Sequence, residues 1–358
     1  MPFVGFSRPF GTYELANANP AVNCRAIVKS PSGRKPTTLG SRRGRSAGAV
    51  AIFSPWSLLL LLSFELLSLG LSSARAAESV TITPSADTAL LQNFPSNNFG
   101  GMAWLNSGTT QIFTTNRGLL KFNVAAHVPR GAQILSASLV VEVVGHPVDG
   151  DTPNSFELHR MLRDWGEGDK TGFPPSLGAP ATEGEANWTH RFALTTNAWA
   201  TPGGLAGADV SPVASVDTFI YGEDFSPYTF DSTPRTVADV QTWLDEPALN
   251  FGWMLISASE ELNFTARRFA SREDTSRAPA LTIEYFAPRI DSVTVSNQVA
   301  SIRFTAEADH SYSLEYCDLL ARTPWLTLTN LPISVMTVPV LAQDSNAPGQ
   351  RYYRLRVQ

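Results

Sequence analysis

Basic side chains are the first group of candidate functional residues in this sequence. Five of them stand out against an acidic background: Arg117, Lys121, Arg267, Arg268 and Arg272. A guanidinium binds a carboxylate through two parallel hydrogen bonds, so these residues could form a patch for a carboxylate-bearing sugar. The alternative is that some pair within the chain, with Glu273, Asp274 or Glu284, as rim salt bridges commonly do. Adjacent strand positions face opposite sides, so only one of Arg267 and Arg268 can face a ligand.

Tryptophans are the second group of candidates, because an exposed aromatic ring can stack on a sugar. Trp104 and Trp165 remain open to ligand contact on this basis. A Trp flanked by Gly and Asp in a long loop more often packs inward and holds that loop. We therefore expect Trp188 and Trp243 in the core.

Calcium is considered as a ligand because extracellular β-sandwiches often carry it and oxygen ligands are plentiful here. Residues 146–154 and 164–169 each offer several carboxylate or amide oxygens. Neither segment has the spacing of an EF-hand loop. The sequence thus leaves Ca²⁺ open, and no metal ligand set can be assigned.

Catalytic motifs are missing from residues 78–358. They contain no G-x-S-x-G elbow, H-E-x-x-H, P-loop or dinucleotide-binding glycine pattern, and the five histidines lack metal-like spacing; the one G-x-S-x-G match, Gly44-Arg-Ser-Ala-Gly48, lies in the basic N-terminal region. Glu183 and Glu185 are close in sequence, but glycoside hydrolysis needs two carboxyl groups facing each other across a cleft. We predict that the protein is not an enzyme.

Residues 1–77 are interpreted as a basic leader with a secretory signal peptide. The apolar run 56–71 follows a positive segment and precedes Ala74-Arg-Ala-Ala77. A retained membrane anchor is the alternative, although Glu65 interrupts the run. Arg42-Arg43 lacks the apolar pair of a twin-arginine signal. The leader predicts a secreted or cell-surface protein with no stable membrane span after cleavage.

Charge and cysteine content restrict the possible partners. Removing residues 1–76 leaves 27 − 9 = 18 basic and 32 − 2 = 30 acidic residues, a net charge of −12. Nucleic acid is excluded as a partner, because binding it requires a basic face. Cys24 belongs to the leader and Cys317 has no partner, so no disulfide framework can form.

Short alternating runs separated by turns predict an all-β fold for the rest of the chain. Residues 78–287 are expected to form a large sandwich, and the predicted strands are 80–84, 87–91, 117–124, 134–144, 156–161, 251–257 and 280–286. The last has Leu281, Ile283 and Tyr285 on one face. Residues 165–207 read as a long irregular segment held by its aromatics. A helix is predicted over 233–245, beginning at Pro234.

Several short motifs give residues 80–286 a resemblance to a known family. In order along the chain they are Asp87-Thr, Asn98-Phe-Gly100, Arg117-Gly-Leu-Leu-Lys-Phe122, Ala137-Ser-Leu139, Asp164-Trp-Gly-Glu-Gly168, Asn187-Trp188, Asp239-Val-Gln-Thr-Trp243, Asn250-Phe-Gly252 and Phe269-Ala-Ser-Arg-Glu273. This region resembles the DNRLRE domain, a secreted jelly-roll β-sandwich family related to alginate-binding carbohydrate-binding modules. The resemblance implies a non-catalytic module that binds acidic polysaccharide. Members are often fused to polysaccharide-degrading or anchoring domains, and this chain shows no catalytic domain.

Residues 288–358 form a separate region after Ala287-Pro288. Six short strands are expected there: 290–295, 300–306, 312–316, 325–329, 335–340 and 352–357. Tyr312-Ser-Leu-Glu-Tyr316, Trp325 and Arg351-Tyr-Tyr-Arg-Leu355 make it similar to the small fibronectin-type-III-like (Ig-like) β-sandwich that often ends secreted bacterial proteins. The resemblance implies a second all-β domain.

Two classes of function remain after these exclusions. The first is a secreted carbohydrate-binding module for uronic-acid polysaccharide, which predicts a basic or aromatic patch on the sheet of Arg117 and Lys121. The second is a structural or adhesive protein of the cell surface or matrix without a specific glycan ligand. The sequence does not choose between them.

Overall fold

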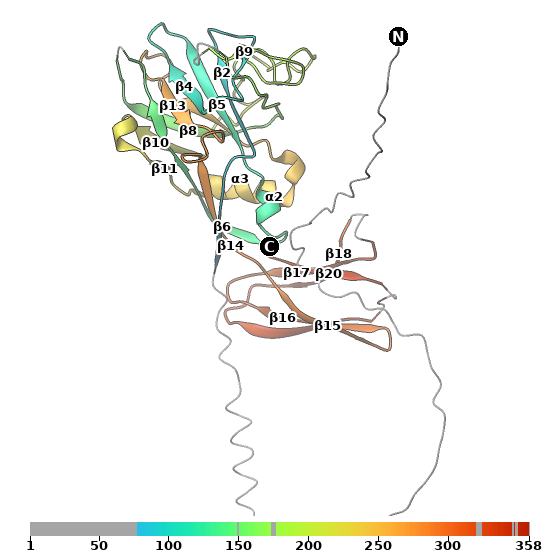
Figure 1. Ribbon diagram of the computed structural model, residues 1–358. Helices are drawn as coiled ribbons and strands as arrows, with labels where there is room; N and C mark the ends of the chain where they lie inside the picture. The colour runs from blue at the N-terminus through green and yellow to red at the C-terminus, as the bar shows by residue number, and fades with distance from the viewer. Residues whose placement is uncertain are drawn as a thin grey trace, which may run out of the picture. The chain divides into compact units, whose positions relative to one another are not determined.

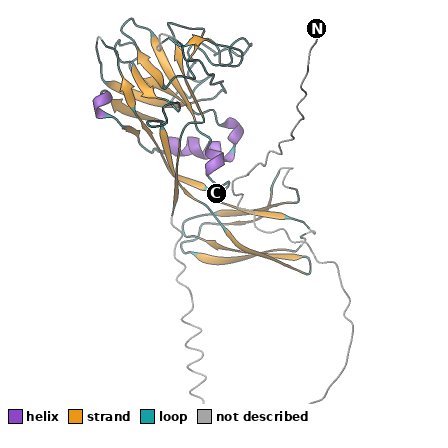
Figure 2. Cartoon of the chain, in the orientation of Figure 1, coloured by secondary structure: helices purple, strands orange, loops and turns teal. Residues whose placement is uncertain are grey.

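The computed structural model describes residues 77–148, 150–172, 177–319, 324–345, 347 and 350–357. The expected leader, signal segment and anchor alternative therefore lie outside the described residues, except for residue 77. The described part of the chain is all-β, as the strand pattern predicted, with only short helices added (Figure 2). It divides into two compact units, the first comprising Ser79–Arg130 and Ile134–Tyr285 and the second containing Phe286–Gln358 and Gly131–Gln133.

Two sheets form the sandwich of the first unit (Figure 1). The smaller sheet has the order β1 (Glu78–Ile82), β14 (Ala280–Phe286), β6 (Gln133–Val141) and β11 (Tyr228–Phe230). The larger sheet has the order β10 (Val216–Ile220), β8 (Asn154–Arg160), β12 (Trp253–Ser257), β5 (Thr115–Lys121), β4 (Trp104–Thr109), β13 (Arg267–Ala270) and β7 (Val143–Gly145), and β2 (Ala86–Leu91) pairs with β5. A small ladder joins β3 (Asn97–Asn98) and β9 (Ala179–Pro180).

Aromatic side chains fill the space between the sheets. Phe156 and Phe269 meet edge to face with ring centroids 5.2 Å apart, and both are buried. Strand β14 has the bounds predicted for it and contributes alternate residues to the core, as expected from its alternation. Strand β12 lies between β8 and β5, which confirms the central position expected from its apolar sequence.

Helix α3 (Pro234–Asp245) covers one end of this core. Its N-cap is Thr233, whose side chain accepts hydrogen bonds from the backbone N–H groups of Arg235 and Thr236. Trp243 packs on Trp253 at a centroid distance of 4.5 Å. The helix therefore begins where the sequence predicted and packs on its apolar face. The other helical segments are α2 (Val124–His127), η1 (Glu223–Phe225) and η2 (Pro247–Leu249).

The long irregular segment covers the outer face of β2, β5 and β12. Its Trp165, Trp188 and Trp199 are buried together with Leu119 and Met254 of the sheet. This explains why Leu119 and Leu120 of β5 are both buried, although adjacent strand residues face opposite sides of the sheet. The large sheet thus has a core on each side at its centre.

One predicted strand is divided between the two sheets. The sequence favoured a single strand over residues 134–144, but the chain passes from β6 in the small sheet to β7 in the large sheet at Glu142. The alternation of buried and half-buried residues continues from β6 through the crossing into β7, so the sequence pattern does not mark the break.

The second unit is a small sandwich of two three-stranded sheets. One has the order β15 (Ile290–Ser296), β16 (Val299–Ala306) and β19 (Val338–Asp344), and the other β18 (Leu326–Leu331), β17 (Tyr312–Cys317) and β20 (Tyr352–Val357). All six predicted strands are present; five agree with their predicted bounds to within two residues, whereas β19 begins three residues and ends four residues later than predicted. Phe304, Tyr312 and Leu314 are central to its own apolar core.

Candidate functional site

A cavity of about 370 Å³ opens beside β4 and β13 in the first unit. Its described lining residues are Asn93, Asn106, Thr110, Gln111, Ile112, Asn116, His146, Pro147, Val148, Leu177, Ala266, Arg267 and Arg268. None of these is Asp or Glu, although the chain is acidic overall. The volume falls in the range of small-ligand sites, and the lining is rich in amide side chains.

Strand β4 reaches this position through a bend at Gly108. The residue has a φ of +100°, and a Cβ there would come within 2.6 Å of the Thr265 carbonyl oxygen. Before the bend β4 pairs with β13, and after it β4 pairs with β5. A glycine is needed here because L side chains rarely adopt this conformation. The bend places Asn106 and Asn116 in the lining of the same cavity.

Arg268 is the exposed cation of the cavity. Its guanidinium lies over the ring of Trp104, 5.2 Å from the centroid, and Asn106 is its partner across the ladder. Within the described part of the chain, Arg268 has no carboxylate within salt-bridge distance. A stacked guanidinium keeps its hydrogen-bonding edge available, so Arg268 can receive an anionic group.

Two buried polar atoms on residues close to this cation lack hydrogen-bond partners. The Asn116 side chain is 4% exposed, and its Oδ1 has no hydrogen-bond partner among the described residues. The buried indole N–H of Trp104 likewise has no hydrogen-bond partner among the described residues. A buried polar group without a partner costs free energy, so such atoms suggest a bound ligand or water.

Arg267 fixes the floor of the cavity from inside. Its Nη1 donates to the carbonyls of Phe264, Thr265 and Ala266, and its Nη2 donates to those of Thr152 and Tyr221. The side chain is completely buried and also pairs with the Asp151 carboxylate. Burial lowers the pKa of the guanidinium from its ordinary value. Arg267 therefore joins three separate loops and is not accessible to a ligand.

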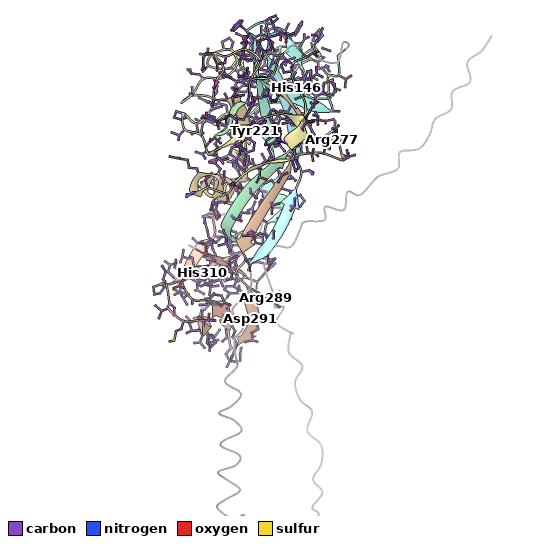
Figure 3. The ribbon with its side chains drawn as sticks, turned by 90° about the vertical axis from the view of Figure 1, so that its left-hand side faces the viewer. His146, Tyr221, Arg277, Arg289, Asp291 and His310 are labelled. Carbon is purple, nitrogen blue, oxygen red and sulfur yellow. The ribbon has the colours of Figure 1, made fainter. Side chains whose placement is uncertain are left out.

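The rim of the cavity combines a histidine–glutamate pair with apolar side chains. His146 Nδ1 is 3.4 Å from Glu223 Oε2, which connects the rim to η1. Ile112 and Val148 are 66% and 97% exposed. His146 is labelled in Figure 3. The cavity is thus amide-rich and basic inside, with an apolar edge.

The other predicted basic residues lie away from this cavity. Arg117 makes a bidentate pair with Glu260, with distances of 2.8 and 2.7 Å, and donates to the carbonyls of Gly203 and Gly204. Lys121 pairs with Asp164 at 3.1 Å. Arg117 and Lys121 each hold in place a segment that covers the outer face of the sheet. Because their charges are used in this way, the five cations do not form the single patch considered from the sequence.

Arg272 belongs to a cluster of carboxylates next to β2. It pairs with Glu167 and Glu273 at 3.2 Å each, and its backbone N–H donates to Asp87. The pKa of Asp87 is raised well above 3.8, mainly by burial, and burial also raises the pKa of Glu167. The internal pairing with Glu273 considered from the sequence is present. The alternative partners Asp274 and Glu284 instead contact Arg277 and Ser136.

The predicted tryptophans separate into two environments. Trp165 is 4% exposed and its indole N–H donates to the Phe251 carbonyl, so it presents no surface to a sugar. Trp104 is half-buried and next to the cavity. Trp188 and Trp243 are buried, as expected. Only Trp104 and Arg268 of the seven predicted site residues remain together with an open surface.

Metal ligation was left open by the sequence. Among the described residues, no group of three or more His, Cys, Asp or Glu side chains is arranged to hold a metal ion. Asp149 of the loop considered for calcium lies outside the described residues. Of the second segment, Asp164 and Asp169 are paired with lysines.

The cavity residues that sequence reasoning missed are mostly amides. Asn106 and Asn116 come from different strands, and His146 follows β7. A lone asparagine in a strand carries no motif, so only pairing across the bend at Gly108 brings these side chains together. Neither asparagine has apolar residues on both sides in the sequence, so no local signal marked them.

No family model matches the chain, and no curated protein matches it significantly. Within the described residues no helix is long and apolar enough to cross a membrane. The arrangement of the cavity therefore carries the functional argument.

Proposed function

We propose that the protein is a non-catalytic carbohydrate-binding module for acidic, uronic-acid polysaccharide, and that the cavity beside β4 and β13 is its site. The observation that carries this proposal is an exposed Arg268 that is stacked on Trp104 and has no carboxylate partner in the described structure. It lies in a cavity whose described lining has no acidic residue. The resemblance to DNRLRE domains leads to the same ligand class, and a secreted location follows from the proposed leader.

The chemistry of the cavity matches that of a uronate residue. The carboxylate of the sugar would accept two hydrogen bonds from Arg268. Its hydroxyl groups would pair with Asn106 and Asn116, whose side-chain amides can donate and accept. Part of the sugar ring would pack against Trp104. Binding of this kind needs no chemical step.

The test is binding of a purified uronic-acid polysaccharide by Arg268→Ala. We expect the dissociation constant to rise about 10- to 100-fold, since a charge-assisted hydrogen-bonded contact is lost. Affinity electrophoresis and isothermal titration calorimetry with alginate and polygalacturonate measure the change. Arg268→Lys should recover part of the affinity, because the charge remains without the bidentate geometry.

Arg235 supplies the matched control. It is an exposed arginine of α3, away from the cavity lining. Arg235→Ala should bind the polymer as the unaltered chain does. Equal losses in the two variants would mean that net charge alone drives binding. A wild-type chain retained by no uronic-acid polymer would refute the proposed function.

An adhesive or structural role is the second candidate, supported by one surface of the second unit. Residues 324–343 contain no charged side chain. Their loop exposes Ile333, Val335 and Met336, at 66%, 84% and 65%. Exposed apolar patches often mark contacts between proteins. This role predicts self-association in sedimentation velocity that Val335→Asp abolishes, and a strictly monomeric wild-type chain would count against it.

A further inference from the structure

A second exposed feature of the first unit is a row of three aromatic rings, here called the aromatic platform. It consists of Phe219 and Tyr221 at the end of β10 and Phe225 of η1, which are 48%, 52% and 67% exposed. The ring centroids are 5.0 Å apart between Phe219 and Tyr221 and 5.5 Å apart between Tyr221 and Phe225. The three side chains thus form one continuous apolar surface.

The core does not require these rings. Val216 and Ile220 are the buried residues of β10, and they already supply its apolar contribution to the sandwich. Three neighbouring aromatic side chains that stay in water have an unfavourable hydration free energy. Contiguous exposed apolar patches often mark binding surfaces.

The aromatic platform is next to the cavity. Arg267, which lines the cavity, donates from Nη2 to the Tyr221 carbonyl at 2.7 Å. On the rim, His146 pairs with Glu223, two residues before Phe225. Figure 3 labels His146 and Tyr221, one from each of the two features. A single extended ligand can therefore contact both.

The two features differ in charge. The described lining of the cavity has no carboxylate and exposes Arg268. The stretch that carries the aromatic platform contains the exposed carboxylates Asp217, Glu223 and Asp224. Asp217 lies two residues before Phe219 on the same strand, so both point to the same face. An anionic sugar would be attracted to the cavity and repelled at the platform.

We propose that the ligand is a heteropolysaccharide in which uronic acid alternates with an uncharged sugar. This inference rests on the proposed function. The uronate occupies the cavity with its carboxylate on Arg268, and the adjoining uncharged sugar lies on the aromatic platform.

The chemistry of the platform fits an uncharged pyranose. The C–H groups on one face of such a ring pack against aromatic carbons and remove apolar surface from water. Its hydroxyl groups donate charge-assisted hydrogen bonds to neighbouring carboxylates. A second uronate at this position would bring like charges together, which disfavours binding. The site consequently discriminates against polymers made of uronate alone.

The experiment compares three polysaccharides of matched length by isothermal titration calorimetry with the mature secreted chain. They are a homopolymer of uronate, a polymer in which uronate alternates with a neutral sugar, and a neutral polymer. We expect the alternating polymer to bind about tenfold more tightly than the homopolymer. The double variant Tyr221→Ala/Phe225→Ala should lose this advantage and bind the homopolymer unchanged.

Two controls separate this inference from the proposed function. Leu249→Ala removes a side chain of similar exposure, 44%, elsewhere in the first unit and should alter no affinity. Thermal unfolding verifies that the double variant is folded, and the Tyr221 carbonyl bond to Arg267 does not depend on the ring. Equal affinity for the two uronate polymers, or an unaffected double variant, would overturn the inference and leave the proposed function standing. Binding of neither uronate polymer would refute both, and tightest binding of the neutral polymer would also overturn the inference.

Discussion

Arg267 and Arg268 are adjacent in β13 and lie in opposite environments. The first is buried and donates to five backbone carbonyls, while the second is exposed over Trp104. Adjacent residues of a strand point to opposite faces of the sheet, so one of the two arginines had to face inward, but the alternation does not determine which one. The buried arginine positions the loops of the site, and the exposed one is available to a ligand.

Replacing Arg267 should therefore affect stability first. We expect Arg267→Met to lower the free energy of unfolding by about 3 kcal/mol, because it leaves several buried carbonyls and the Asp151 carboxylate without their donor. Urea denaturation followed by tryptophan fluorescence measures the change. Arg268→Met is the matched control, and a surface substitution of this kind should stay within about 0.5 kcal/mol. Equal effects in the two variants would contradict the assigned roles.

Asp87 predicts a pH dependence of stability. Burial raises its pKa well above 3.8, so the folded state keeps a proton that the unfolded chain has already lost. Its stabilising contribution is complete below pH 3.8 and is lost as the pH rises through the folded pKa. Asp87→Asn keeps an acceptor for the Arg272 N–H and should flatten the decline of the unfolding free energy above about pH 4. An unchanged slope in denaturation curves across this range would show that Asp87 is not the group responsible.

Among the elements, the bend of β4 and the crossing from β6 to β7 decide where the site forms. The bend at Gly108 allows one strand to pair with both β13 and β5. The crossing brings β7, and with it the loop of His146, to the edge of the large sheet. A prediction based on alternation could not separate β6 from β7, since one apolar pattern runs through both.

Helix α3 offers a test at the level of an element. Its N-cap Thr233 forms a capping box with Thr236, and its Oγ1 also donates to the Ser215 carbonyl at 2.6 Å. We expect Thr233→Ala to reduce the free energy of unfolding by about 1 kcal/mol, as for other N-cap threonines. Thr233→Ser retains the hydroxyl and should recover most of this loss. Calorimetric unfolding of the two variants compares them directly, and equal destabilisation would contradict the capping role.

On the scale of the whole molecule, the chain contains two units with separate apolar cores. Phe304, Tyr312 and Leu314 belong to the core of the second unit, whereas the cavity and the aromatic platform lie entirely in the first. The proposed ligand site should therefore function without a contribution from the second core.

A core substitution in the second unit tests this separation. Phe304→Ala removes a fully buried ring and should lower the stability of that unit by about 3–5 kcal/mol. Calorimetry should show the change, while polysaccharide affinity measured below the transition stays the same. A loss of affinity in the folded variant would mean that the second unit takes part in binding.

The sequence by itself determined the local structure of this protein. Alternation predicted β14 and the six strands of the second unit, and the threonine and proline at residues 233–234 predicted the start of α3. These features depend on neighbouring residues and on the period of the backbone, which a single sequence contains.

Tertiary structure decided which of the predicted side chains stay accessible. Arg117, Lys121 and Arg272 find carboxylates 143, 43 and 105 residues away in sequence, and these pairings remove them from a common patch. Asn106, Asn116 and Arg268 share a cavity only because β4 bends and pairs with strands from distant parts of the chain. Ion pairing and burial depend on such long-range proximity. Of the predicted residues, Arg268 thus remains exposed in the proposed site, with its guanidinium over the half-buried Trp104.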